Sequence, residues 1–168
     1  LETDRAWGIV GARELVTVTV NGVQQGAATA DDLGFFWTTL YDANGQRPNF
    51  TSGDVIAIRH GATISSVTVR SISGSVDPVT NIVSGTIGGV VAPISVTVYV
   101  PWSEPSLTWS FSRTVNSDAA GHFSANFSGL FDLTSEDNAA VAYIQNGIEV
   151  HAHVYPFHTL MLRPPLRR

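Results

Sequence analysis

Hydrophobic and polar residues alternate along several short segments of the chain. Residues 16–20 are Val-Thr-Val-Thr-Val, and residues 94–100 and 148–154 alternate in the same way. Successive side chains of a β-strand point to opposite faces of a sheet, so each segment is expected to bury one face and expose the other. No long window combines a 3.6-residue period with helix-capping residues. The sequence therefore predicts an all-β protein.

Tight-turn dipeptides separate these segments. Glycine adopts a positive φ at no steric cost, and two-residue hairpin turns require that conformation. The dipeptides flanked by β-forming residues are Asn21-Gly22, Asn44-Gly45, His60-Gly61 and Asn146-Gly147. We expect sequential antiparallel hairpins at these positions.

The two halves of the chain contain the same succession of landmarks. An aspartate–glycine turn leads into a strand at residues 30–40 and again at residues 117–127. Alignment of the turn glycines pairs apolar residues on one strand face, Phe36 with Phe123 and Leu40 with Phe127. A Val-rich strand and a Thr-Ser-x-Asp turn recur in the same order, at offsets between 80 residues (Val16 to Val96) and 87 residues (Gly34 to Gly121). Near-constant offsets predict a duplicated module.

Residues 73–81 lie between the two copies and have the composition of a linker. They are rich in Ser, Gly and other polar residues, and Pro78 has no N–H to donate to a sheet. We therefore place the first β-sandwich repeat at residues 1–76 and the second at residues 77–168. The second repeat ends in a basic tail, Leu-Arg-Pro-Pro-Leu-Arg-Arg.

Composition excludes several classes of protein. The net charge is −5 and the chain has no lysine, which argues against a nucleic-acid partner because phosphate binding needs clustered cations. There is no cysteine, so neither disulfides nor thiol chemistry are available. No segment approaches the ~20 apolar residues of a membrane-spanning helix.

The strand and turn motifs resemble the Ig-like repeats of bacterial surface and secreted proteins. The likeness rests on the Val-Thr-Val-Thr-Val strand from Val16, the Asp-Ala-Ala-Gly-His-Phe-Ser stretch from Asp118, the Ser-x-Asp turn that ends at Asp137, and the junction at residues 73–85. The resemblance implies two tandem Ig-like, Greek-key-type β-sandwich modules joined by a short linker. It also implies a role as a spacer, stalk, adhesin or accessory module. The first copy departs from the pattern in its longer segment at residues 41–50.

Two segments have residue types that bind metals. Glu149, His151 and His153 share one strand face, and zinc requires at least three converging ligands of this kind. The alternative is a polar strip that faces solvent. Residues 42–46 place oxygen ligands at alternate positions, as calcium loops do, but no bidentate carboxylate follows, so an Asn-Gly hairpin turn is the other interpretation. We expect no cofactor.

The sequence contains no catalytic motif such as a Gly-x-Ser-x-Gly nucleophile elbow. Asp31, Asp32 and Asp118 occupy turn positions, where a carboxylate caps nearby backbone N–H groups. We therefore expect a protein that is not an enzyme. The alternative that two carboxylates act as a glycosidase pair stays open at this point, because the distance between two carboxyl groups depends on the fold.

Exposed aromatic residues are the candidates for a contact with a ligand or partner. Trp37 follows Phe36 and should face solvent if Phe36 is buried, and Tyr41 and Phe50 bound the loop beside it. Trp109 and Phe111 alternate with polar residues, so we expect both in the core. Two sequons, at Asn49 and Asn126, are potential N-glycosylation sites, and Asn126 should face outward from a strand.

Three hypotheses about function follow from these features. The first is a structural or adhesive module of an extracellular or cell-surface assembly, such as a filament or sheath subunit. Such subunits would form homo-oligomers, or join neighbouring modules, by strand exchange between sheet edges, with residues 1–5 or 157–162 as donors. The second is a carbohydrate-binding module that stacks a glycan on Trp37, and the third is an accessory domain of a secreted hydrolase.

Overall fold

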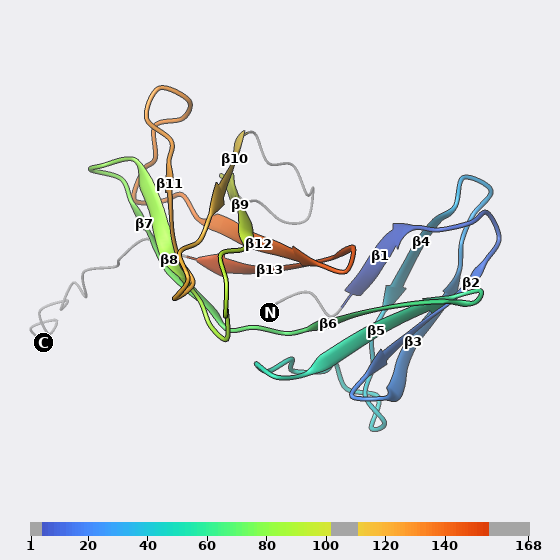
Figure 1. Cartoon of the computed structure of the whole chain (residues 1–168). Coiled ribbons are helices and arrows are strands. Elements are labelled where there is room, and N and C mark those ends of the chain that lie inside the picture. Colours follow the sequence, from blue (N-terminus) through green and yellow to red (C-terminus); the bar gives the residue numbers. More distant parts are fainter. Residues whose placement is uncertain (1–4, 102–110, 155–168) are drawn as a thin grey trace, which may run out of the picture. The chain divides into compact units, whose positions relative to one another are not determined.

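The computed structural model describes residues 5–101 and 111–154, and every regular element in these ranges is a β-strand. None of the described elements is a helix suited to crossing a membrane. The all-β prediction is confirmed. The strands, drawn in Figure 1, are β1 (Arg5–Ile9), β2 (Leu15–Val20), β3 (Val23–Thr29), β4 (Phe35–Thr39), β5 (Val55–His60), β6 (Thr63–Thr68), β7 (Ile72–Asp77), β8 (Ile82–Ile87), β9 (Ser95–Val100), β10 (Phe111–Asn116), β11 (His122–Asn126), β12 (Ala139–Gln145) and β13 (Ile148–Val154).

Strands β1–β6 form the first repeat, an Ig-like β-sandwich of two antiparallel sheets. One sheet has the strand order β3-β2-β5-β6, and the other consists of β1 and β4. The Val-Thr-Val-Thr-Val strand is β2, and its Val16 and Val18 side chains have no exposed surface. Phe36 of β4 packs in one buried cluster with Val16. The alternating pattern therefore encodes the inward face of each sheet, as expected.

Strands β8–β13 repeat this arrangement strand for strand. Their sheets have the orders β10-β9-β12-β13 and β11-β8, which match β3-β2-β5-β6 and β4-β1. The pairing registers also match, because Gly8 lies opposite Phe36 and Gly85 lies opposite Phe123. A Cβ atom at Gly85 would stand 2.8 Å from the Phe123 ring, and one at Gly8 would stand 3.0 Å from the Phe36 ring. Both repeats thus need a small residue beneath the same aromatic ring.

The aspartate–glycine turns have the same hydrogen bonds in both repeats. The Asp31 carboxylate accepts from the N–H groups two and four residues further along, at 2.8 and 2.9 Å, and Asp118 accepts at the same distances. The turn glycines, Gly34 and Gly121, have φ values of 85° and 87°. A Cβ at either glycine would overlap the backbone carbonyl oxygen of the adjacent strand. The turn chemistry is therefore a property of the duplicated module.

Residues expected to form a linker instead belong to a strand and its turn. β7 spans Ile72–Asp77 and pairs with β8 along all six residues. The turn between them is held by Asp77, whose carboxylate accepts from the Thr80 hydroxyl at 2.7 Å. The boundary suggested by the sequence, between residues 76 and 77, lies at the end of β7. Ser-Gly-Ser composition did not prevent a strand here, because the neighbouring β8 supplies a complete ladder of backbone partners.

The chain divides into two compact units. The first comprises residues 1–71 and 142–152, and the second comprises residues 72–141 and 153–168. Within the first unit, Tyr143 donates to the Thr68 carbonyl at 3.0 Å and accepts from the Arg70 N–H at 2.9 Å. Burial raises the pKa of the Tyr143 hydroxyl, which favours the neutral form that donates this hydrogen bond. Tyr143 therefore attaches β12 to the end of β6 and the residues that follow it.

Candidate functional site

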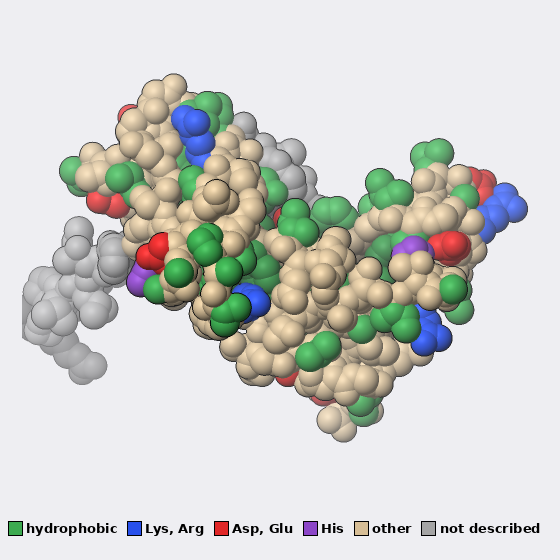
Figure 2. Space-filling view, viewed as in Figure 1, with side chains coloured by type: hydrophobic (Ala, Val, Ile, Leu, Met, Phe, Trp, Pro, Cys, Tyr) green, Lys and Arg blue, Asp and Glu red, His purple; other side chains and the backbone are tan. Residues whose placement is uncertain are grey.

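The outer face of the β1–β4 sheet is unusually apolar. Cross-strand pairing places Trp7 opposite Trp37 and Ile9 opposite Phe35. These four side chains, which we call the aromatic face, have between 45% and 80% of their surface exposed. The Arg5 guanidinium carbon lies 5.5 Å from the centre of the Trp37 ring, within the range of a cation–π interaction. Figure 2 shows hydrophobic side chains exposed on this part of the surface.

The same face of the second repeat is polar. The positions equivalent to Trp7, Ile9, Phe35 and Trp37 are occupied by Ser84, Thr86, His122 and Ser124, in the same cross-strand pairs. A shared fold therefore does not require apolar residues here. Large exposed apolar groups that the fold does not need are a feature of contact surfaces.

Sequence reasoning found only one residue of the aromatic face. Trp37 faces solvent, as expected from the burial of Phe36. Trp7, Ile9 and Phe35 were missed, although Trp7 and Ile9 alternate with the small residues Ala6 and Gly8. That alternation becomes informative once β1 is known to pair with β4, because pairing brings the four exposed side chains together.

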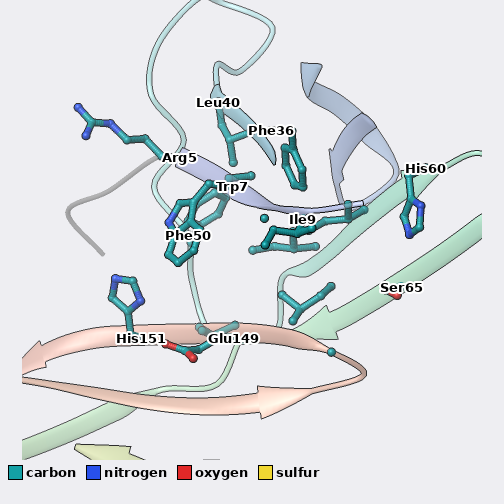
Figure 3. A pocket seen from close by; sticks show the side chains of 17 residues that line it. Arg5, Trp7, Ile9, Phe36, Leu40, Phe50, His60, Ser65, Glu149 and His151 are labelled. Atoms are coloured by element: carbon teal, nitrogen blue, oxygen red, sulfur yellow. The ribbon is translucent and has the colours of Figure 1, made fainter. Parts of the chain in front are cut away.

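A cavity of about 410 Å³ lies beside β1 in the first unit (Figure 3). All five residues of β1 line it, whereas β4 contributes only its core-facing Phe36. Alternate residues of a strand face opposite ways, so one cavity meets five consecutive residues only along the edge of the strand. The remaining lining residues are Leu40, Phe50, Ile56, Ile58, His60, Ser65 and residues 147–151. The cavity is thus bounded by the β1 edge and lined by both apolar and polar side chains.

Trp37, Tyr41 and Phe50, the residues that the sequence proposed for a contact, do not gather in one place. Trp37 belongs to the aromatic face, and Tyr41, 48% exposed, donates its N–H to the Gln25 carbonyl at 2.8 Å. Phe50 is half-buried and lines the cavity together with Trp7. Trp7 therefore connects the aromatic face with the cavity.

The proposed metal ligands are not brought together as a set of three. Glu149 and His151 line the cavity, His151 points toward it in Figure 3, and His153 does not contribute to its wall. Within residues 5–101 and 111–154, no three His, Asp or Glu side chains form a group that could hold a metal ion. Burial raises the pKa of the Glu149 carboxyl.

Most of the candidate carboxylates are used by turns. Asp42 accepts the Asn44 and Gln46 N–H groups, both at 2.8 Å, so residues 42–46 form a turn of the same kind as those at Asp31 and Asp118. Hydrogen bonds from the His122 and Ala120 N–H groups, and from the His122 side chain, hold the pKa of Asp118 below its usual value. Asp32 was expected to cap backbone N–H groups and instead pairs with Arg13 at 2.6 Å. The N–H groups of this turn donate to Asp31.

The other predicted positions have the following places. Asn49 is exposed, and Asn126, the last residue of β11, is exposed as expected; its side-chain oxygen accepts the Ser128 N–H at 2.8 Å. Use of either sequon stays a prediction. Phe111 is half-buried, and its ring centre lies 5.1 Å from that of Phe131. Trp109 and the two proposed donor segments, residues 1–5 apart from Arg5 and residues 157–162, lie outside the described residues.

No protein-family model and no curated protein matches the sequence. Among solved structures, the chain is similar to the pullulanase SAP of Group B Streptococcus at 6% identity and a TM-score of 0.34, over 88% of this chain and 23% of that one. It is also similar to the CD2-binding domain of CD58 (lymphocyte function-associated antigen 3) at 7% identity and a TM-score of 0.28, over 89% and 90% of the two chains. The chain spans less than a quarter of the pullulanase. These scores assign neither a family nor a function to the chain.

Proposed function

We propose that this chain is a structural or adhesive module of an extracellular or cell-surface assembly, and that it performs no catalysis. The observation that carries the proposal is the aromatic face of the first repeat. The equivalent residues of the second repeat are polar, so the face is not a requirement of the fold. The finer form of the proposal is a filament or sheath subunit whose copies join through the first repeat by strand exchange.

The energetics of the aromatic face favour a partner. Trp7 and Trp37 are about half exposed, at 49% and 50%, and lie side by side across two strands. Burial of apolar surface contributes about 25 cal/mol per Å², and Trp is enriched among the residues that dominate protein interfaces. Arg5 over Trp37 adds a cation at the rim of this surface. Arg, like Trp, is enriched at such contacts.

The double substitution Trp7→Ser and Trp37→Ser tests the proposal, because Ser84 and Ser124 show that serine suits these positions in the same fold. We expect the wild type to self-associate as its concentration rises in sedimentation velocity, and the double variant to associate at least tenfold more weakly. The control is Val79→Ser with Val91→Ser, which removes two valines that are 91% and 95% exposed elsewhere on the chain. Equal association of all three proteins would contradict the proposal.

Carbohydrate binding is the second candidate, and the Trp7–Trp37 pair favours it. Sugar rings stack on aromatic faces, and two adjacent exposed indoles offer a platform for more than one residue of a glycan. A glycan array with the same three proteins separates the candidates. Binding by the wild type and by the valine control, lost in the tryptophan variant, would support a carbohydrate module in place of self-assembly. Absence of binding by the wild type would remove this candidate.

A further inference from the structure

Among the strands that the structure describes, β1 is paired along one edge, whereas its counterpart β8 is paired along both. In the second repeat, β8 pairs with β11 on one side and with β7 on the other. In the first repeat, β1 pairs with β4, and no other described strand pairs with it. The two-stranded sheet of the first repeat therefore lacks the counterpart of β7 among the residues that the structure describes.

The unpaired edge presents backbone groups at known positions. The Val10 N–H donates to the Gly34 carbonyl at 2.9 Å, so it points toward β4. Backbone groups of an antiparallel strand alternate in direction, so the N–H groups of Trp7 and Ile9 point to the opposite edge. An edge of this kind is a template for another strand.

In the second repeat, β7 covers the core at the equivalent place. Val76 of β7 has no exposed surface, and neither have Val83 and Ile87 of β8. The counterparts of Val83 and Ile87 in the first repeat, Ala6 of β1 and Val10 directly after it, remain partly exposed. The 410 Å³ cavity lies along this same edge. The cavity thus marks the place where a third strand would complete the first repeat.

We propose that the β1 edge and its cavity accept residues 157–162 from a second copy of this chain. This inference rests on the proposed function and specifies how the copies join. The segment is Phe-His-Thr-Leu-Met-Leu, which has the six-residue length of β7 and carries apolar side chains on both of its strand faces. One face would fill the cavity against its apolar residues, such as Phe50, Ile56 and Ile58, and the other would lie beside the aromatic face. Arg163 and two prolines follow immediately and would end the strand.

A second copy is the occupant that follows from the proposed function, in which copies of the chain join through the first repeat. The chain's own tail is the alternative occupant, and the concentration dependence of amide protection at Trp7 and Ile9 separates the two.

The acceptor is tested with Ile9→Pro in the full chain. Proline removes an N–H that makes no bond to β4, so the β1–β4 pairing is kept while the edge is blocked. Ile9→Ala is the matched control, since it removes the side chain but keeps the N–H. We expect Ile9→Pro to weaken self-association at least tenfold relative to Ile9→Ala in sedimentation velocity. Equal association of the two variants would overturn the proposal, and thermal unfolding of dilute samples confirms that both are folded.

The donor is tested with Leu160→Asp and Met161→Asp together, which places a charge on each face of the segment. This variant keeps a functional acceptor edge, and Ile9→Pro keeps a functional donor. We expect each to be monomeric alone and the equimolar mixture to form dimers. In the wild type, the amides of Trp7 and Ile9 should become protected from hydrogen exchange as concentration rises. A mixture that stays monomeric overturns the proposal. Protection of the Trp7 and Ile9 amides that is independent of concentration also overturns it, because it would indicate that the chain's own tail pairs with β1.

These experiments separate this inference from the proposed function. Self-association could require Trp7 and Trp37 but be unaffected by Ile9→Pro and by the tail variant. That result would keep the assembly proposal and overturn the inference that the β1 edge accepts a strand. A wild type that is monomeric at every concentration would overturn both.

Discussion

The two repeats share the Asp-x-x-Gly turn and the strand order, and they contrast at the sheet that contains β1 in the first repeat and β8 in the second. Among the described residues, this sheet has two strands and an aromatic outer face in the first repeat, and three strands and a polar outer face in the second. The residues that form the turns are the ones that did not change. Asp31 and Asp118 accept equivalent hydrogen bonds, and Gly34 and Gly121 have φ values within 2° of each other. Duplication thus preserved the positions that the backbone requires and left the outer face and edge free to diverge.

The largest expected effect concerns the core aromatic residue of each repeat. Phe123 is 4% exposed in the completed sandwich, and Phe123→Ala should lower the free energy of unfolding by about 3–5 kcal/mol. Phe36 borders the cavity, so its ring has fewer neighbours to lose. Phe36→Ala should therefore lower the free energy of unfolding by about 3 kcal/mol or less, the lower end of the range expected for Phe123→Ala. Denaturant unfolding of dilute full-length variants measures both. A larger loss at Phe36 than at Phe123 would show that the first repeat is packed as fully as the second.

An intermediate effect concerns the edges of β1 and β8. Thr86 is the counterpart of Ile9, and its N–H points toward β7, so Thr86→Pro removes a hydrogen bond of the β7–β8 ladder. We expect a loss of about 1–3 kcal/mol for Thr86→Pro, from the unpaired β7 carbonyl, and less than about 0.5 kcal/mol for Ile9→Pro. Thermal unfolding at low concentration compares the two. Equal losses would mean that the β1 edge is already paired within one chain.

The smallest effect concerns pH and contrasts a cavity carboxyl with a turn carboxyl. Burial raises the pKa of Glu149 in the folded state above its ordinary value of 4.5. The free energy of unfolding therefore falls as pH rises from the unfolded-state pKa to the folded-state pKa of this carboxyl. Glu149→Gln should therefore raise Tm slightly at pH 7 and leave it unchanged at pH 3. The pKa of Asp118 is lowered, so its contribution exists above 3.8 and is lost in acid. Asp118→Asn should lower Tm at pH 7 but not in strong acid. The same sign for both variants at pH 7 would contradict the assigned environments.

Much of the fold could be predicted because its determinants are local. Alternation at residues 16–20 specifies which side chains face inward, and the Asn-Gly and Asp-x-x-Gly stretches specify turns through φ preferences and short-range hydrogen bonds. Duplication is visible for the same reason, since both copies need the same residues at those turns. The outward direction of Trp37 also follows from alternation, because its neighbour Phe36 is apolar and falls at a core position.

The candidate site depends on pairings between residues far apart in the chain. Nothing local in the sequence places Trp7 opposite Trp37, brings Phe50 to the cavity, or makes Ser-Gly-Ser residues of β7 a strand. A strand forms where a neighbouring strand satisfies its backbone, and which strands become neighbours is decided by the packing of whole sheets. The sequence by itself therefore determined the strands, the turns and the duplication, through local conformational preference. Only the tertiary structure decided which faces and edges remain open, because exposure is a property of the assembled sheets.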